Sequence, residues 1–269
     1  MPEQDITTFE KLAKLRKELN ELGVDGFLVP LADEYQGEYV PASSRRLEWL
    51  TGFTGSNGAA MVLQDKAAVL TDGRYTIQIK QEVDQQNYEL GDFADTSIGK
   101  WIAANAKKDS TIGFDPKLYT QDQISKIEED IKESGVSLKP LLENPLDNIW
   151  RDRPEEPKGL VQLFPLQYAG KPYAEKANEI FNALDTEKAQ ACVITLPDSI
   201  CWLLNVRGDD VPMLPIVLST VILDVENRKI EWFVDPDKIS NEIISAFEDD
   251  VVIKDISGLQ ARLEEVAGL

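Results

Sequence analysis

One arrangement of apolar segments occurs twice in this sequence, and this repetition constrains the fold more than any other feature. Trp49-Leu50 is followed by Gly55, and Trp202-Leu203 is followed by Gly208, so a glycine stands six positions after the tryptophan in both segments. The spacing between the two tryptophans is far too long for a solenoid repeat and indicates a duplicated domain.

The first half opens with an amphipathic helix whose apolar residues recur at spacings of three and four: Phe9, Leu12, Leu15, Leu19 and Leu22. Thr7 and Glu10 form a capping box at its start, and Gly23 ends it. A short buried strand over 26–30 follows, and residues 59–63 and 67–71 predict a hairpin. A later helix carries Ile124, Ile127 and Ile131 and closes at Gly135.

The second half repeats this order with a helix, a strand over 191–197, the Trp202 segment, two strands and a further helix. The two helices are marked by Tyr173, Ala177, Ile180 and Leu184, and by Ile239, Ile243, Ile244 and Phe247. The first copy carries an insertion over 33–46, and the second has a longer hairpin over 212–233. Hairpins beside helix-linked strands predict an α/β fold with a mixed sheet flanked by helices in each copy.

Three prolines mark the connection between the copies. Pro145, Pro154 and Pro157 lie among charged residues, and prolines at this density favour a stiff, extended segment over 143–157. We therefore place the domains at 1–150 and 151–269.

The absence of histidine restricts the chemistry. Without it, Ser-His-Asp triads, Cys-His pairs and His-based zinc hydrolysis are excluded within these 269 residues, whereas a metal site made only of carboxylates stays open. The net charge of −20 disfavours binding to nucleic acid and to anionic membranes. No apolar run reaches ~18 residues, the length that a membrane-spanning helix needs.

Two cysteines and the N-terminal residues bear on location. Cys192 and Cys201 lie in apolar surroundings without CxxC or zinc spacing, which is typical of buried free thiols in a reducing compartment. The first residues lack the basic start and apolar stretch of a secretory signal. We expect a cytoplasmic protein.

Several motifs in the sequence resemble those of a known protein family. They are Glu38-Tyr39-Val40, Arg45-Arg46, Thr51-Gly52-Phe53-Thr54-Gly55-Ser56-Asn57-Gly58, Thr71-Asp72-Gly73-Arg74-Tyr75, Gly113-Phe114-Asp115-Pro116, the segment 144–154 and the segment 198–211. In this order they resemble the two creatinase-type N-terminal domains of cytosolic Xaa-Pro aminopeptidases. In one departure from the family, Val211-Pro212-Met213-Leu214-Pro215 stands where its members carry a histidine.

The resemblance implies a third, pita-bread metallopeptidase domain that holds two divalent ions (Mn or Zn) and cleaves short proline-containing peptides. We expect that domain to follow Leu269, and we expect the parent enzyme to be a homodimer. No catalytic or metal-binding residue of the family can be assigned to the present chain, which is expected to be inactive and free of cofactors by itself.

The segment Asp72–Tyr75 contains the residues expected nearest to substrate: Asp72, Arg74 and Tyr75. In the structural interpretation, Asp72 caps the following helix, Gly73 supplies a tight turn and Arg74 pairs with a nearby carboxylate. In the functional one, Arg74 reaches a substrate carboxylate or a partner subunit.

Other motifs favour structural roles. Gly52, Gly55 and Gly58 lack the Lys-Ser/Thr of a phosphate loop and are expected to form backbone turns. Trp49 and Trp202 are expected to anchor the two cores. Arg207-Gly208-Asp209-Asp210 lacks the convergent partners of a metal site.

Three functions remain open. The first is the non-catalytic N-terminal part of an Xaa-Pro aminopeptidase, which shapes substrate access and subunit pairing. The second is a free-standing, non-enzymatic binding module that lacks a peptidase domain. The third, with least support, is a carboxylate-only metalloenzyme.

Overall fold

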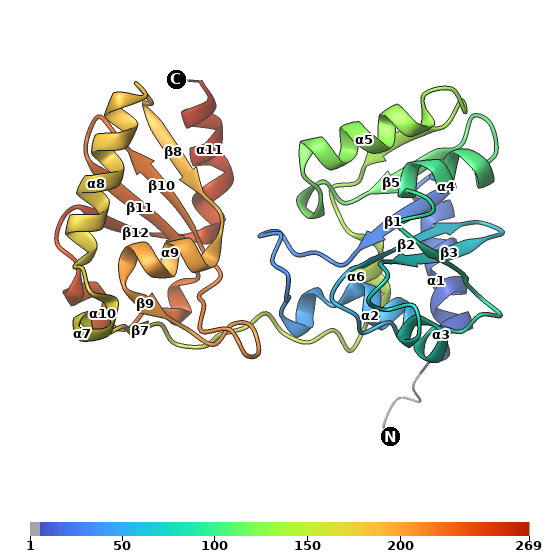
Figure 1. Ribbon diagram of the computed structural model, residues 1–269, viewed down its shortest axis with the longest axis horizontal. Helices are drawn as coiled ribbons and strands as arrows, with labels where there is room; N and C mark the ends of the chain where they lie inside the picture. Colours follow the sequence, from blue (N-terminus) through green and yellow to red (C-terminus); the bar gives the residue numbers. More distant parts are fainter. Residues whose placement is uncertain (1–5, 269) are drawn as a thin grey trace. The chain divides into compact units, whose positions relative to one another are not determined.

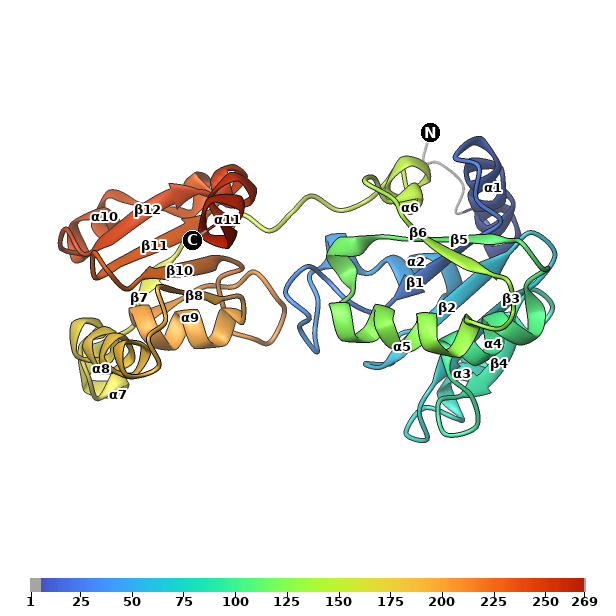
Figure 2. The same cartoon turned by 90° about the horizontal axis from the view of Figure 1, so that it is seen from above.

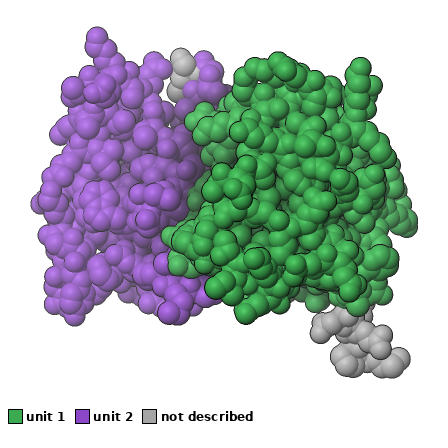
Figure 3. Space-filling model, turned by 45° about the vertical axis from the view of Figure 1, so that its right-hand side comes forward, with its two compact units in different colours: residues 1–155 green, residues 156–269 purple. Residues whose placement is uncertain are grey.

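The computed structural model describes residues 6–268, and the chain divides into two compact units. Unit 1 ends at Glu155 and unit 2 begins at Glu156, and Figure 3 shows the two in different colours. Each unit has its own sheet and its own core. Both sheets are mixed and flanked by helices, which confirms the α/β fold class.

Unit 1 is built on a six-stranded sheet with the order β4-β3-β2-β1-β5-β6. Its strands are β1 (Gly26–Pro30), β2 (Gly58–Leu63), β3 (Ala67–Thr71), β4 (Glu89–Asp92), β5 (Thr111–Phe114) and β6 (Ser137–Pro140). The antiparallel β2–β3 pair is the predicted hairpin, and its register places Gly58 opposite Thr71. β4 pairs in parallel with β3, and β5 pairs in parallel with β1.

Helices cover both faces of this sheet (Figures 1 and 2). They are α1 (Thr8–Glu21), α2 (Arg46–Thr51), α3 (Gln78–Glu82), α4 (Ile98–Asn105), α5 (Gln121–Ile131) and α6 (Pro145–Ile149), with 3₁₀ turns at Ala42–Ser44 and Pro116–Leu118. One core lies between the sheet and α1, α2, α3 and α6, and a second core lies beneath α4 and α5.

The predicted N-terminal helix forms with its capping box, since the Thr7 hydroxyl accepts a hydrogen bond from the Glu10 N–H and the Glu10 carboxylate accepts one from the Thr7 N–H. Leu12, Leu15 and Leu19 make its buried face. Phe9, predicted on that face, is instead 65% exposed, because the apolar stripe is narrower than the sequence pattern indicated.

The expectation of an extended connection over 143–157 is wrong in its first part. Residues 145–149 form the helix α6, because Asn144 caps its N-terminus by accepting the Leu146 N–H. Pro145 occupies the first helical position, where its missing N–H costs nothing. Leu146 is fully buried in the core of unit 1, and α6 packs against α1.

Three charged residues hold the end of this segment on unit 1, and we call them the Asp147 cluster: Arg46, Asp147 and Arg153. Arg46 is almost fully buried and donates to both carboxylate oxygens of Asp147, at 2.7 and 2.9 Å. Arg153 donates to Asp147 at 3.1 Å and to the Ser43 carbonyl at 2.7 Å. Arg46 lies on α2 and Asp147 on α6, so the cluster ties these two helices together.

Unit 2 has a four-stranded sheet with the order β12-β11-β10-β8 and a separate β7–β9 pair. Its strands are β7 (Gln162–Leu163), β8 (Ala191–Ile194), β9 (Val206–Arg207), β10 (Thr220–Asp224), β11 (Lys229–Val234) and β12 (Val251–Asp255). Its helices are α7 (Leu166–Ala169), α8 (Tyr173–Thr186), α9 (Pro197–Leu204), α10 (Asn241–Ala246) and α11 (Leu259–Ala267), with 3₁₀ turns at Pro236–Lys238 and Ile256–Gly258. The predicted strand over 191–197 is shorter than expected, because Pro197 begins α9.

The duplication is visible in the strand order. β8, β10, β11 and β12 pair antiparallel, antiparallel and parallel, as β1, β2, β3 and β4 do in unit 1. Within residues 156–268, nothing corresponds to β5, α5 and β6, so β8 lies at a sheet edge whereas β1 is paired on both sides.

Trp49 and Trp202 each make the same two contacts with a lysine of the preceding long helix. Lys11 of α1 donates to the Trp49 carbonyl and lies 5.0 Å from the centre of its ring. Lys176 of α8 donates to the Trp202 carbonyl and lies 4.7 Å from that ring. Their burial differs, however. Trp49 is partly buried and stacks on Trp150, whereas Trp202 is 50% exposed, so the expectation that Trp202 anchors the core is wrong.

Neither unit offers a membrane-crossing element: among residues 6–268, no helix combines the necessary length with the necessary apolar character.

The two thiols differ in burial, which makes a prediction possible. Cys201 is 2% exposed, and burial raises its pKa to about 11, whereas Cys192 is partly exposed, although burial raises its pKa too. Only the thiolate reacts, and a raised pKa lowers its fraction at every pH below that value. At about pH 8, a disulfide reagent should modify Cys192 in the folded chain and Cys201 only after unfolding. Rapid loss of both thiols in folded protein would contradict this.

Candidate functional site

The segment Asp72–Tyr75 begins where β3 ends and forms a tight turn. The Tyr75 N–H donates to the Asp72 carbonyl at 3.0 Å, and the Asp72 carboxylate accepts the Arg74 N–H at 3.0 Å. The next helix, α3, begins only at Gln78. The expectation that Asp72 caps that helix is therefore wrong, because its carboxylate is used within the turn.

Asp72 and Arg74 form a two-point ion pair. Arg74 Nε lies 2.9 Å from Asp72 Oδ1, and Arg74 Nη2 lies 2.8 Å from Oδ2. Asn57 Nδ2 adds a third donor to Asp72, at 2.7 Å. These hydrogen bonds lower the pKa of Asp72 well below its usual range, and the bond from the Arg74 side chain has the largest effect. The hydrogen bond to Asp72 in turn raises the pKa of Arg74. Both groups are charged across the physiological range.

Tyr75 supports the guanidinium from another side. The Arg74 guanidinium carbon lies 5.1 Å from the centre of the Tyr75 ring, which is a cation–π contact. The Tyr75 hydroxyl shares a 2.7 Å hydrogen bond with Ser56, and that bond lowers the pKa of Tyr75. The ring meets Phe53 edge-on at 5.9 Å. The structure thus brings the three predicted residues, Asp72, Arg74 and Tyr75, into one cluster.

This cluster is suited to recognition. The Arg74 side chain is 59% exposed, and its Nη1 atom makes no hydrogen bond to any residue in 6–268. A guanidinium that is held on its Nε side presents its outer edge to a planar anion such as a carboxylate.

Two supporting residues, Ser56 and Asn57, had no assigned role in the sequence. The signal that locates Asn57 is the hairpin register: since Gly58 lies opposite Thr71, the preceding Asn57 lies beside Asp72. The hydroxyl of Thr71 also donates to the Asn57 carbonyl at 2.6 Å, which fixes this corner of the hairpin.

The Arg207–Asp210 segment in unit 2 forms a buried ion pair. Lys238 Nζ lies 2.8 Å from Asp210 Oδ2, and both side chains are at most 5% exposed. The Leu218 N–H donates to the same carboxylate oxygen at 2.6 Å. Throughout residues 6–268, no group of three or more acidic or thiol side chains is arranged to hold a metal ion.

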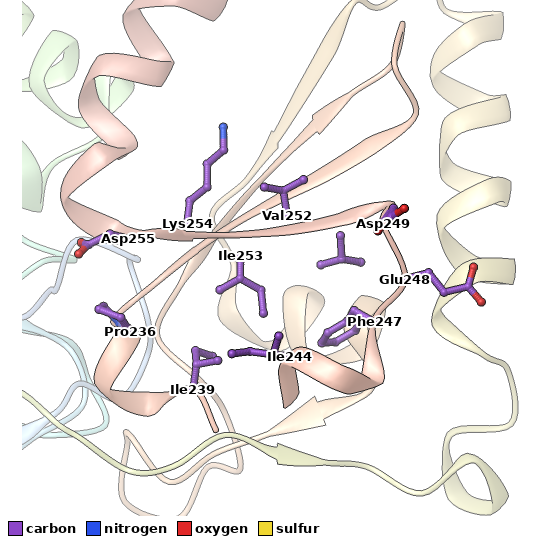
Figure 4. Close-up of a pocket in the computed structure, with 11 residues that line it drawn as sticks. Pro236, Ile239, Ile244, Phe247, Glu248, Asp249, Val252, Ile253, Lys254 and Asp255 are labelled. Atoms are coloured by element: carbon purple, nitrogen blue, oxygen red, sulfur yellow. The ribbon is translucent and has the colours of Figure 1, made fainter. Parts of the chain in front are cut away.

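Unit 2 also has an apolar groove between α10 and β12 (Figure 4). Ile239, Ile244, Phe247 and Ile253 line it and point toward one another, while Val252 and Lys254 project from the other side of β12. Glu248 and Asp249 lie at its rim. Its lining provides apolar packing and no convergent polar groups, so it is a weaker candidate than the Arg74 cluster.

Comparisons with known proteins match each unit to the same domain family. Two profiles, each described as the creatinase/prolidase N-terminal domain, match residues 11–144 and 152–268. Probable Xaa-Pro aminopeptidases P of Neosartorya fischeri and Aspergillus niger are each 35% identical, over 96% and 93% of this chain. The chain spans only about two fifths of the length of these relatives, 40% and 41%.

A solved structure agrees with these matches. The X-prolyl aminopeptidase of Caenorhabditis elegans, described as a cytosolic enzyme with a di-nuclear active site, is 29% identical with a TM-score of 0.91. The similarity covers 98% of this chain and 45% of that enzyme. The chain therefore belongs to the creatinase/prolidase N-terminal domain family, of which it contains two domains, and it is homologous to the N-terminal part of Xaa-Pro aminopeptidase P.

Proposed function

We propose that this chain is the non-catalytic N-terminal part of an Xaa-Pro aminopeptidase, an enzyme that releases an N-terminal residue preceding proline. The observation that carries the proposal is the homology to aminopeptidases P, which extends over nearly the whole chain. Reading the gene past Leu269 tests it. A peptidase-sized domain with Asp, His and Glu ligands is the expected result, and a stop codon there would favour the free-standing binding module instead.

In this proposal, two divalent ions, Mn or Zn, act in the catalytic domain. The relative from C. elegans is described as having a di-nuclear active site. The residues of this chain do not fit such a site, because it has no histidine and residues 6–268 hold no cluster of metal-ligating side chains. No catalytic step is therefore assigned to any residue of this chain.

The purified chain should neither hydrolyse Xaa-Pro peptides nor bind Mn or Zn stoichiometrically. The reason is the lack of imidazole and of converging carboxylates, which are the ligands that such ions require. Peptide hydrolysis followed by mass spectrometry, with metal analysis of the same sample, measures both. Metal-dependent release of N-terminal residues by protein free of contaminating protease would revive the carboxylate-only metalloenzyme.

The chain's own contribution, in this proposal, is to select short peptides. Arg74 stands on an exposed turn, fixed by Asp72 and stacked on Tyr75, with its outer edge available to an anion. The C-terminal carboxylate of a short peptide suits this edge, and a longer peptide would place an uncharged peptide group there. Asp72 and Tyr75 are positioning residues, because they act through Arg74.

In the complete enzyme, Arg74→Ala should raise KM for tripeptides roughly five- to tenfold and leave kcat nearly unchanged, because the lost contact stabilises ground state and transition state equally. Arg45→Ala is the matched control, since Arg45 is partly exposed in the same unit and pairs with Glu48. A tripeptide amide, which lacks the carboxylate, should be insensitive to Arg74→Ala. Unchanged kinetics with a lowered Tm would assign Arg74 to a structural role.

The proposal also includes a cytosolic location and a homodimeric parent enzyme. The description of the C. elegans relative as cytosolic supports the location. Sedimentation of the complete enzyme tests the pairing of subunits, and a monomer at micromolar concentration would remove that part of the proposal.

A further inference from the structure

The groove between α10 and β12 in unit 2 runs along the outer edge of a sheet (Figure 4). β12 is the outermost strand in the order β12-β11-β10-β8, so one side of its backbone has no strand partner within residues 156–268. All of β12, Val251–Asp255, lines the groove, although successive side chains of a strand point to opposite faces. The groove therefore follows the free edge of the strand, where a sheet can accept a further strand.

The floor of this groove is apolar. Ile239, Ile244, Phe247 and Ile253 point toward one another in Figure 4. Phe247 meets the buried Trp232 edge-on at 5.9 Å, which anchors one side of the floor in the core of unit 2. Ile244 is 56% exposed.

Unit 1 shows what the fold itself requires at this place. Its edge strand β4 pairs with β3 as β12 pairs with β11, since Asp92 lies opposite Thr71 and Asp255 lies opposite Val234. A depression also lies beside β4, so an open edge here is common to both copies. In unit 1, however, polar side chains supply much of its lining: Lys80, Gln85, Gln86 and Asn87.

One pair of equivalent residues makes the contrast specific. Ile244 directly follows Ile243, the buried residue of α10, and Lys80 directly follows Ile79, the buried residue of α3. Both Ile244 and Lys80 are exposed. The fold thus accepts a lysine at this position, and nothing in it demands the exposed isoleucine of unit 2. An exposed aliphatic residue beside a free strand edge favours association, which soluble proteins suppress with charged residues unless they use it.

The ends of the groove are acidic. Glu248 and Asp249 precede β12 and Asp255 ends it, and all three side chains are exposed and form no ion pair with any residue in 6–268. Lys254, the cation of the strand, is committed to Glu231 at 2.8 Å. A complementary partner therefore carries basic residues on both sides of an apolar stretch.

We propose that the free edge of β12 binds an extended segment of a partner protein, in which a short alternating apolar stretch is flanked by lysine or arginine. The segment joins the sheet as an additional strand, and its backbone hydrogen bonds to β12 supply affinity. Every second side chain enters the groove over Ile244 and Ile253, and the basic ends face the acidic rim.

A fluorescein-labelled peptide, Lys-Arg-Val-Thr-Ile-Thr-Val-Arg-Lys, is the probe. Its central stretch from valine to valine matches the length of β12, and alternation places the apolar side chains on one face. Titrated with the full chain, it should show a saturable rise in anisotropy with a Kd below about 1 mM. A peptide with serine in place of valine and isoleucine keeps the charge and should not bind, which separates groove binding from attraction to an acidic surface.

Ile244→Lys should weaken binding at least about tenfold, because it removes an apolar anchor and repels the basic ends. Met213→Lys is the matched control, since Met213 is 98% exposed in the same unit and the substitution adds the same charge. It should leave binding nearly unchanged. Glu248→Lys is a second variant in case Ile244→Lys alters the fold, which circular dichroism reports. Its effect should shrink as salt is raised, because exposed charges are screened.

N-methylated peptides test the extended conformation. Successive residues of a strand direct their N–H groups to opposite edges, so only one of two neighbours donates to β12. N-methylation of the central isoleucine and of an adjacent threonine should therefore differ in effect: one should abolish binding and the other should be tolerated.

Several results would overturn the proposal. They are the absence of saturable binding up to about 1 mM peptide, equal binding of the serine peptide, and equal binding by Ile244→Lys and Met213→Lys. Tolerance of both N-methyl groups would exclude strand addition and indicate a helical occupant. A dimer of the chain alone that Ile244→Lys dissociates in sedimentation would assign the edge to a second copy.

Discussion

Asp147→Asn should lower the free energy of unfolding of unit 1 by about 3 kcal/mol, the lower end of the range found when one partner of a buried ion pair is removed, because the Asp147 side chain is itself 27% exposed. The cause is Arg46, whose side chain is 4% exposed and which loses the charge that compensates its own. One of its nitrogens, Nη1, already lacks a hydrogen-bond partner among the described residues, so the guanidinium has no reserve of contacts. Arg153 loses an acceptor in the same substitution.

Hydrogen exchange measures this effect for each unit separately, which matters because two units need not unfold together. Amides of β2 and β3 should lose protection in Asp147→Asn, while amides of β10 and β11 should keep it. Asp152→Asn is the matched control: Asp152 is an exposed carboxylate of the same segment, and its substitution should change stability by less than about 0.5 kcal/mol. Equal losses in the two variants would show that the Asp147 cluster adds nothing.

Lys238→Met should destabilise unit 2 by a similar amount, about 3–5 kcal/mol, because it leaves the Asp210 carboxylate buried without its partner. Burial raises the pKa of Asp210 even though Lys238 opposes that change, so the ionised carboxylate is already less stable in the fold than in water. Its Oδ1 atom has no hydrogen-bond partner in the described part of the chain.

A double variant separates the loss of charge from the loss of shape. Lys238→Met combined with Asp210→Asn removes both charges and keeps an acceptor for the Leu218 N–H. It should recover at least about 2 kcal/mol of the loss, since a neutral pair has no uncompensated charge. Lys171→Met removes an exposed pair with Glu179 and should cost less than about 1 kcal/mol. A double variant no more stable than Lys238→Met would refute this account.

Local patterns in the sequence predicted most of the elements correctly. The capping box of α1, the strand β1, the β2–β3 hairpin and the apolar face of α5 each depend on residues within one turn or one hairpin. The duplication was visible because Trp-Leu occurs at equivalent places, and the strand order of the two sheets confirms it. The register of the β2–β3 hairpin also places Asn57 beside Asp72.

The errors arose where distant segments meet. A proline-rich stretch was expected to be extended, but Asn144 and Pro145 start a helix, and contacts with α1 keep it folded. Asp72 was expected to cap a helix, but Asn57, from the facing strand end, and Arg74 draw its carboxylate into the turn. The exposure of Trp202 depends on which segments pack around it in the fold, and the Trp-Leu pattern does not contain that information. The ion pairs Arg46–Asp147 and Asp210–Lys238 join residues 101 and 28 positions apart.

The distance between Arg46 and Asp147 also bears on the order of events while the protein is being made. A ribosome adds about 5–20 residues per second, so Arg46 emerges roughly 5–20 s before its partner. During that interval Arg46 has no carboxylate partner from α6, and burying its guanidinium would leave an uncompensated charge. The first domain thus reaches its final form only when the segment leading into the second has been translated.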